Sequence, residues 1–189
     1  YIFVSNNFRF GYKREGNVKL LKKFQKKYQY KLINPKPLII KNKVISSTLI
    51  RKLLQNGELS SANKILKRNW SIEGTVEKGR MMGKKIGFPT CNIDIKNYIL
   101  AKTGVYAVKV NVKKNRKIYG GIANLGYRPT FNQKKLLLEV NLFNFSGNLY
   151  NKKLSVEFLK FIRGEKKFNG IDDLRNQIKR DLLIAKKVK

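Results

Sequence analysis

Glycines, basic residues and hard oxygen ligands gather between Gly79 and Asp94, in the stretch G-R-M-M-G-K-K-I-G-F-P-T-C-N-I-D. Its regularly spaced glycines and the cations between them are Gly79, Gly83, Gly87, Arg80, Lys84 and Lys85. Glycines let a backbone approach a polyphosphate closely, and the cations would neutralise its charge. The spacing differs from the phosphate loop G-x-x-x-x-G-K-[ST], so a phosphate site and an ordinary glycine-rich hairpin loop are both open.

Two oxygen ligands follow in the same stretch. Thr90 and Asn92 come after Pro89 at the expected start of a strand, and alternation along a strand puts both side chains on one face. A hydroxyl and an amide oxygen suit Mg²⁺, which keeps waters and takes ligands from phosphate groups. The segment therefore predicts a magnesium ion bound together with a phosphate.

Glu139 interrupts an apolar run, L-L-L-E-V-N-L-F-N-F at residues 136–145. A carboxylate in such a strand is costly to bury unless it is paired or used. Strand alternation places it on the same face as Asn141 and Phe143. It is either a general base that takes a proton from a substrate hydroxyl, or one half of a salt bridge to one of the 43 lysines and arginines.

Two further segments have chemical possibilities. In G-I-A-N-L-G-Y-R-P-T-F (121–131), Gly126 and Pro129 favour a turn, while Tyr127 and Phe131 offer flat aromatic surface or core packing. In I-S-S-T-L-I-R (45–51), hydroxyl groups stand at an expected helix start with an arginine one turn later, and these residues are Ser46, Ser47, Thr48 and Arg51. Free N–H groups at a helix start bind anions, although plain helix capping is the commoner meaning.

The elements that would position these residues divide the chain near Arg68. Residues 1–68 alternate helical and extended patterns. A helix is expected at Val18–Tyr28, a buried strand at 37–40, and a second helix after Ser46 and Ser47. This alternation suggests an α/β domain with a parallel sheet. After Trp70, five apolar runs separated by turns predict strands at Ser71–Lys78, Val105–Val112, Lys117–Leu125, Leu136–Phe143 and Leu154–Ile162. A helix over Ile171–Lys187 completes a small antiparallel barrel with a helix packed on it.

Charge and composition exclude several classes. The net charge of +32 invites a nucleic-acid partner, but the lysines are spread along the whole chain, so we expect no nucleic-acid partner. Histidine is absent and Cys91 is the single cysteine, which argues against a zinc site and against disulfides and favours the cytoplasm. No run reaches the roughly 18 apolar residues of a membrane span. The apolar start Y-I-F-V suggests the C-terminal part of something longer.

Seven motifs in order resemble the bacterial bifunctional riboflavin kinase/FAD synthetase family. They are N-F-R-F-G with R-E-G, I-S-S-T-L-I-R, G-F-P-T-C-N, G-V-Y-A-V, A-N-L-G-Y-R-P-T-F, L-L-E-V-N-L-F-N-F-S-G-N-L-Y and R-G-E-K-K-F. The resemblance implies an α/β remnant of a nucleotidyltransferase-type, Rossmann-like domain at residues 1–68, the C-terminal part of an FMN adenylyltransferase domain. It implies a riboflavin kinase domain at 69–189, a six-stranded antiparallel barrel with a C-terminal helix.

The resemblance also implies functions for single residues. Glu139 is the catalytic glutamate, Thr90 helps to bind Mg²⁺, Asn92 contacts the nucleotide, and the glycine-rich stretch covers the phosphates of ATP. The aromatic candidates for flavin contact are Tyr127, Phe131 and Phe145. The adenylyltransferase remnant comprises Asn7, Ser46, Ser47, Thr48 and Arg51. The small-molecule partners are riboflavin, FMN and ATP.

The chain departs from the family pattern in two respects. It has no histidine and starts downstream of the family's phosphate-binding signature, so we expect this chain to make FMN, and FAD only in the full-length protein. The usual histidine of L-L-E-V-H is Asn141, and a following acidic position is Asn144. The alternatives are a catalytically degenerate flavin-binding barrel and a basic barrel that binds nucleic acid.

Overall fold

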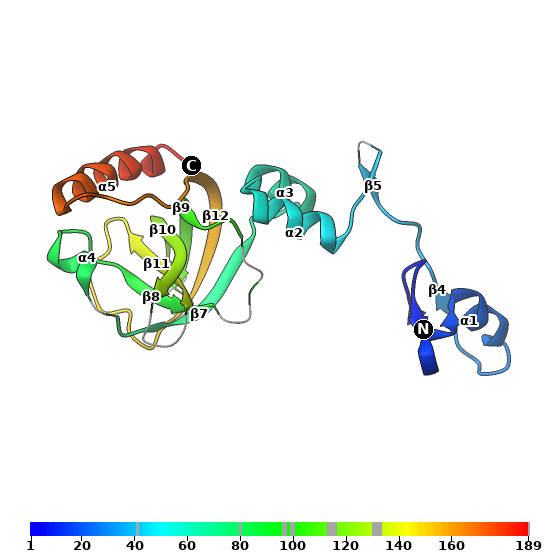
Figure 1. Cartoon of the computed structure of the whole chain (residues 1–189). Helices are drawn as coiled ribbons and strands as arrows, with labels where there is room; N and C mark the ends of the chain where they lie inside the picture. The colour runs from blue at the N-terminus through cyan, green and yellow to red at the C-terminus, as the bar shows by residue number, and fades with distance from the viewer. Residues whose placement is uncertain are drawn as a thin grey trace. The chain divides into compact units, whose positions relative to one another are not determined.

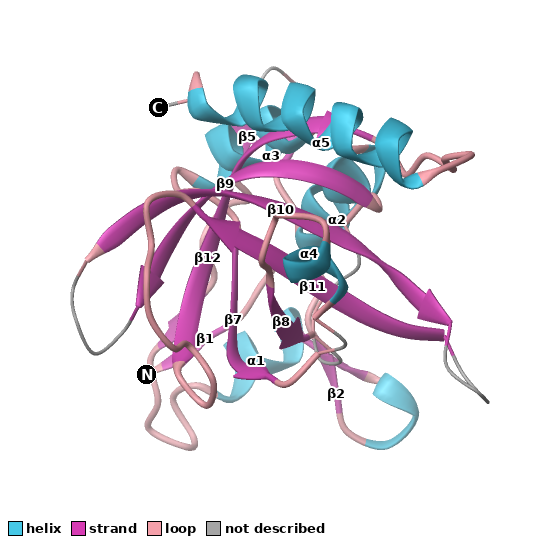
Figure 2. Cartoon of the chain, turned by 90° about the vertical axis from the view of Figure 1, so that its left-hand side faces the viewer, coloured by secondary structure: helices cyan, strands magenta, loops and turns pink. Residues whose placement is uncertain are grey.

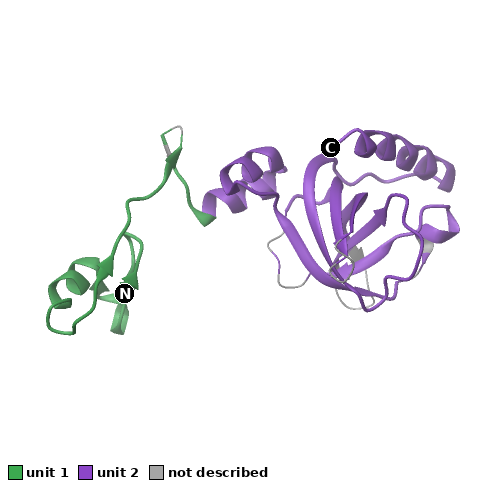
Figure 3. Cartoon of the chain, turned by 180° about the vertical axis from the view of Figure 1, so that it is seen from behind, with its two compact units in different colours: residues 1–47 green, residues 48–189 purple. Residues whose placement is uncertain are grey.

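A computed structural model describes residues 1–40, 42–79, 81–95, 98, 101–112, 117–129 and 134–188. Within these ranges the side chains of residues 43, 82, 128, 129, 134 and 135 are not described. The chain forms two compact units, Tyr1–Ser47 and Thr48–Lys189 (Figure 3). Each unit is described by itself below.

The first unit is a small α/β arrangement. Strand β1 (Ile2–Phe3) pairs in parallel with β4 (Leu32–Ile33), and helix α1 (Val18–Phe24) lies between them in sequence. The side chain of Asn17 caps α1 by accepting a hydrogen bond from the Leu20 N–H, 3.1 Å. The parallel pair with an intervening helix confirms the strand–helix alternation expected from the sequence, although α1 ends four residues before Tyr28.

Short hairpins complete this unit. Their elements are β2 (Arg9–Phe10), the 3₁₀ helix η1 (Tyr12–Arg14), β3 (Gly16–Asn17), β5 (Ile39–Ile40) and β6 (Lys43–Val44). Strand β2 pairs with β3, and β5 with β6, both antiparallel. The expectation of a buried strand at 37–40 is wrong, because Leu38 and Ile39 are 58% and 60% exposed.

Two helices at the start of the second unit are packed on the barrel. They are α2 (Ser47–Asn56) and α3 (Leu59–Leu66). Their apolar side chains Leu54, Leu59 and Ala62 belong to the barrel's hydrophobic core. Asn63 of α3 donates to the Phe158 carbonyl (2.9 Å) and accepts from the Trp70 N–H (2.8 Å), which fixes α3 to the strand beneath it.

Six antiparallel strands close into the barrel (Figure 1). They are β7 (Ser71–Glu77), β8 (Cys91–Asp94), β9 (Gly104–Val112), β10 (Ile118–Pro129), β11 (Lys134–Leu142) and β12 (Lys153–Arg163). Their order around the barrel is β10-β11-β8-β7-β12-β9. The barrel confirms the five long strands predicted from the sequence. Of the two residues expected to shape a turn, Gly126 instead lies inside β10, and Pro129 is the last residue of that strand.

Aromatic and branched side chains fill the barrel. Phe158 is fully buried, with its ring centroid 4.6 Å from that of Trp70 and 5.0 Å from that of Tyr106. Alternate residues of each strand point inward, as the burial of Ile72, Val76 and their neighbours along the other strands shows. The other face of the strands is therefore free to form sites.

Two helices lie on that outer face (Figure 2). Helix α5 (Ile171–Lys186) packs against β9, β10 and β12 and begins with Asp172 and Asp173 in its first turn, where the helix dipole favours acids. The short helix α4 (Met82–Lys85) stands in the glycine-rich stretch between β7 and β8. No helix of the described residues is both long and apolar enough to cross a membrane.

The barrel core sets a first prediction. Leu154→Ala, at a side chain that is fully buried, should lower the free energy of unfolding by about 2–5 kcal/mol, since it leaves a cavity. Ile118→Ala on β10, 64% exposed, is the control and should change it by less than about 0.5 kcal/mol. Urea unfolding followed by the fluorescence of Trp70, the single tryptophan, measures both. Equal effects of the two substitutions would contradict this account of the core.

Candidate functional site

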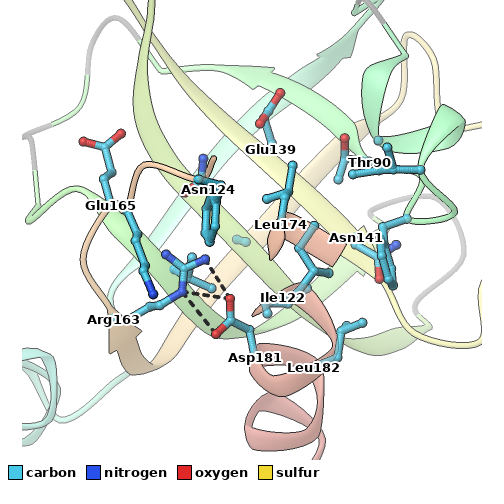
Figure 4. Close-up of a pocket in the computed structure, with 18 of the residues that line it drawn as sticks. Thr90, Ile122, Asn124, Glu139, Asn141, Arg163, Glu165, Leu174, Asp181 and Leu182 are labelled. Atoms are coloured by element: carbon cyan, nitrogen blue, oxygen red, sulfur yellow. Dashed lines mark hydrogen bonds and ion pairs between the residues drawn. The ribbon is translucent and has the colours of Figure 1, made fainter. Parts of the chain in front are cut away.

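A cavity of about 430 Å³ lies on the outer face of the barrel, between the strands, helix α5 and the α4 segment (Figure 4). Its apolar lining is Ile86, Phe88, Val105, Ile122, Ala123, Phe168, Ile171, Leu174, Ile178 and Leu182. Its polar lining is Thr90, Asn124, Glu139, Asn141, Arg163, Glu165, Lys166 and Asp181, with Gly83 from the backbone of α4. A mainly apolar cavity with a few polar groups is typical of small-molecule sites.

Strand register places Glu139 at the centre of a polar row. Across neighbouring strands, Glu77 pairs with Asn92, Asn92 with Glu139, Glu139 with Asn124, and Asn124 with Val105. Cross-strand partners share a face of the sheet, with Cβ atoms roughly 4.5–5.5 Å apart. Glu139 therefore stands on the outer face between two amides.

The structure bears on the two interpretations of Glu139. Within the described part of the chain, no ion pair or hydrogen bond engages its carboxylate, so the salt-bridge interpretation gains no support. The neighbouring Asn141, on the same face as expected, donates from Nδ2 to the Pro89 carbonyl at 2.6 Å. That bond ties β11 to the segment that carries Thr90.

The α4 segment closes tightly over Thr90. A Cβ atom on Gly83 would lie 2.4 Å from the Phe88 carbonyl oxygen and 3.2 Å from the Thr90 hydroxyl, so only glycine fits there. The Phe88 N–H donates to the Gly83 carbonyl at 2.8 Å. Gly87 has φ +90°, a conformation that favours glycine. Two of the three regularly spaced glycines thus have a backbone reason for their identity.

Asn92 is buried directly against Gly79, the first of the three glycines. Its side chain is 7% exposed, and a Cβ atom on Gly79 would lie 1.7 Å from its Nδ2. Its Oδ1 has no hydrogen-bond partner within the described part of the chain. An unpaired buried acceptor costs about 1–3 kcal/mol, so this atom is available to a ligand that carries a donor or a cation.

An ion pair that the sequence analysis missed joins α5 to the barrel beside the cavity. Asp181, 2% exposed, receives hydrogen bonds from Nε of Arg163 (2.9 and 3.1 Å) and from Gln177 (2.9 Å), and its Oδ2 lies 2.8 Å from Nη2 of Arg163. Arg163 also donates to the Gly164 carbonyl at 2.9 Å. Asp181 falls on the apolar stripe of α5 between Ile178 and Leu182. A carboxylate on a buried stripe indicates a buried partner, so this position could have predicted the ion pair.

Other predicted site residues lie elsewhere. Lys84 and Lys85 are exposed on α4 and do not line the cavity. Tyr127 is 46% exposed and also lies outside its lining, while Phe145 packs edge-on against Tyr119 with the ring centroids 5.2 Å apart. Arg80 and Phe131 fall outside the described residues.

The residues expected to handle adenylate are spread over both units. Asn7 is exposed and accepts from the Ser5 hydroxyl at 2.8 Å. The remaining ones, at the start of α2, are exposed: Ser46, Ser47, Thr48 and Arg51. The division between the units falls between Ser47 and Thr48, so their shared role stays a prediction.

The donor set limits what metal could bind. Within the described ranges, no three His, Cys, Asp or Glu side chains lie close enough together to hold a metal ion. The Thr90 hydroxyl and the orphan Asn92 oxygen, both in the α4–β8 region, fit an ion that takes most of its ligands from phosphate and water. The free thiol of Cys91 is a poor candidate because burial raises its pKa to about 11.

Comparisons with known proteins bear on this site. Residues 66–189 match the family model for riboflavin kinase, and residues 1–49 match that for FAD synthetase. A bifunctional riboflavin kinase/FMN adenylyltransferase of Buchnera aphidicola subsp. Schizaphis graminum is 44% identical over 99% of this chain and 61% of its own length. The protein of the same name from Bacillus subtilis is 46% identical over 74% of this chain and 45% of its own.

A solved structure has the same fold. A crystal structure described as a macrolide-efflux protein from Streptococcus pneumoniae superposes with a TM-score of 0.82 at 29% identity, over 98% of this chain and 59% of that one. The present chain spans about three fifths of the length of the first of its curated relatives.

The ion pair sets a second prediction. Asp181→Ala should destabilise the second unit by about 3–5 kcal/mol, because it leaves the Arg163 cation without its buried partner. Asp172→Ala on the same helix removes the same charge from a side chain that is 91% exposed, and should cost less than about 1 kcal/mol. Thermal unfolding of both variants measures the difference. A small effect at Asp181 would show that the pair contributes no net stability.

The thiol sets a third prediction. With the pKa of Cys91 at about 11 in the folded chain against 9.0 ordinarily, alkylation at pH 8 should be about 100-fold slower in the native than in the unfolded protein. The folded state keeps this proton as the pH rises from 9 to 11 while the unfolded state loses it, so stability falls over that window. Mass spectrometry after timed iodoacetamide treatment, with and without urea, gives the ratio. Equal rates would contradict the burial.

Proposed function

The chain belongs to the riboflavin kinase family, and on that premise we propose that its barrel transfers the γ-phosphoryl group of ATP to the terminal hydroxyl of riboflavin, giving FMN and ADP. Glu139 carries the proposal: no described residue pairs with its carboxylate, which stands at the centre of the polar row and faces a cavity shared with the Thr90 hydroxyl and the Gly83 backbone. Oxygen ligands, a glycine backbone and one free base are the parts that phosphoryl transfer requires.

In the proposed reaction Glu139 accepts the proton of the 5′-hydroxyl of the ribityl chain. The hydroxyl oxygen forms a bond to the γ-phosphorus, the bond from that phosphorus to the bridging oxygen breaks, and ADP leaves with the electron pair. Positioning and electrostatics dominate phosphoryl transfer, so a sparse set of side chains is sufficient. The register that holds Glu139 between Asn92 and Asn124 supports such positioning.

We assign the nucleotide to the α4 side of the cavity. The proposed ATP-binding residues are Gly79, Gly83, Lys84, Lys85, Gly87 and Asn92. The close fit of Gly83 over Thr90 leaves backbone groups near any bound phosphate. Thr90 would hold Mg²⁺, and the Asn92 oxygen, two residues further along the chain, has no partner among the described residues. When bound with ATP, the ion would offset the charge that builds up on the phosphate oxygens.

The flavin is assigned to the apolar part of the same cavity, against α5. Side chains such as Ile122, Leu174 and Ile178 suit a flat, weakly polar ring system. Tyr127, Phe131 and Phe145 stay as proposed flavin contacts from the sequence. We propose the cytoplasm as the site of this reaction, with riboflavin, ATP and FMN as its partners and no nucleic acid.

Residues 1–49 support a proposal for the complete protein. Their match to FAD synthetase and the names of the relatives suggest that the full-length protein also transfers AMP to FMN. Within this chain the residues proposed to serve that step are Asn7, Ser46, Ser47, Thr48 and Arg51. We propose residues 1–68 as the adenylyltransferase part of the chain and residues 69–189 as the riboflavin kinase domain.

The proposed base gives a fourth prediction. Glu139→Gln should lower the rate of FMN formation by about 10²–10⁴, the usual contribution of a general base. Chromatography of flavins after incubation with riboflavin and Mg-ATP measures it. Glu157→Gln is the matched control, because Glu157 lies on β12 away from the cavity, and a glutamine keeps an acceptor for the Asn69 amide.

Three results would contradict the proposal in different ways. Undiminished FMN formation by Glu139→Gln would keep the kinase but return Glu139 to a structural role. No FMN from the folded parent chain would favour a catalytically degenerate flavin binder. Strong salt-sensitive binding to RNA or DNA without ATP turnover would favour the basic nucleic-acid-binding barrel.

A further inference from the structure

The cavity contains a second carboxylate that the proposed reaction does not use. Glu165 lines it together with Glu139, and no ion pair or hydrogen bond to another described residue engages either one. The chain has 43 lysines and arginines for 11 acidic residues, yet Glu165, at the exposed rim of the cavity, is paired with no described one of them. The neighbouring Arg163 does not serve, because Asp181 and the Gly164 carbonyl occupy its guanidinium.

The backbone of β10 makes room for this carboxylate. A Cβ atom on Gly126 would lie 2.5 Å from Oε1 of Glu165, so the oxygen rests where a side chain would otherwise stand. Gly126 lies two residues beyond Asn124, which pairs with Glu139. Two residues of a strand span about 7 Å, so Glu165 occupies a separate position along the cavity wall from the proposed base.

The surroundings of Glu165 are those of a polar, aromatic end of the cavity. Phe168 lines the cavity, with the Arg163 guanidinium carbon 5.8 Å and the Lys166 ammonium 5.9 Å from its ring centroid. Figure 4 shows the carboxylate of Glu165 directed away from the Arg163–Asp181 pair. The cavity lining thus includes an acceptor at Glu165, a cationic donor at Lys166 and an aromatic ring at Phe168.

Resting on the proposed function, we propose that Glu165 is a specificity residue that accepts a hydrogen bond from the imide N–H of the flavin ring. The neutral ring system has this one N–H group, and two carbonyl oxygens flank it. Lys166, adjacent to Glu165 and lining the same cavity, can donate to a flanking carbonyl. Glu165 and Lys166 are exposed at the rim of the empty cavity, and a bound ring would cover them. Apolar cavity walls cannot discriminate well between similar rings, whereas an acceptor that the bound ring pairs with and covers can.

The ribityl hydroxyls are the competing donors. The terminal one belongs at Glu139, and the others follow within a few bonds of it. Glu165 rests against Gly126, two residues along β10 from Asn124, the cross-strand partner of Glu139. That separation favours the ring over the chain as its partner.

Equilibrium binding without ATP tests the proposal independently of catalysis. Riboflavin and 3-methylriboflavin, in which a methyl group replaces the imide hydrogen, are titrated by flavin fluorescence into the parent chain and Glu165→Ala. The parent should bind the methylated flavin about tenfold more weakly, the low end for a hydrogen bond to a charged group. Glu165→Ala should bind riboflavin about tenfold more weakly than the parent and no longer distinguish the two flavins.

Two more variants separate recognition from charge and folding. Gly126→Ala keeps the charge but displaces the carboxylate, and should also lose the discrimination. Asp172→Asn removes one charge from an exposed position on α5 and should still discriminate between the two flavins. Retained discrimination in Glu165→Ala, or none in the parent, would overturn the proposal even if FMN is formed. Discrimination without FMN formation would uphold it and refute the kinase.

Discussion

The register of the six-stranded barrel is the constraint on which the cavity depends. Because Asn92, Glu139 and Asn124 are direct cross-strand partners, the position of each follows from hydrogen bonds that also close the barrel. A slip of one residue in β11 would turn Glu139 inward, where Leu138 and Val140 are now fully buried. Burying Glu139 and exposing Leu138 and Val140 would be costly, so the packing of the barrel core alone keeps the polar row on the outer face.

Two different devices cover this row. On one side the α4 segment fits closely because Gly83 brings the Phe88 carbonyl and the Thr90 hydroxyl together. On the other side α5 is joined to β12 by the buried pair of Arg163 and Asp181. The α4 segment fits because Gly83 has no side chain. Helix α5 is held because a buried Asp181 carboxylate without its Arg163 partner would be costly. Among the described residues, neither device engages the Glu139 carboxylate.

The sequence predicts those parts of the fold that have a strong local pattern. Four of the five predicted strands and α5 agree with the structure to within two residues at each end, whereas β10 runs four residues beyond the predicted Leu125. The alternation that places Asn141 on the same face as Glu139 is observed. The pairing of Arg163 with Asp181 depends on closure of the barrel between distant segments, which no local pattern encodes. Tyr127 and Phe145 illustrate the same limit, because an aromatic residue in a motif has no marker for the face on which it lies.

The helices α2 and α3 have a consequence for how such modules combine. Leu54, Leu59 and Ala62 are part of the barrel core, and Asn63 supplies hydrogen bonds to the backbone at Trp70 and Phe158. A gene fusion or a protease cut after Arg68 would therefore strip apolar cover from the barrel. The boundary between the compact units lies ahead of Thr48, so a cut there would leave both helices with the barrel that they cover.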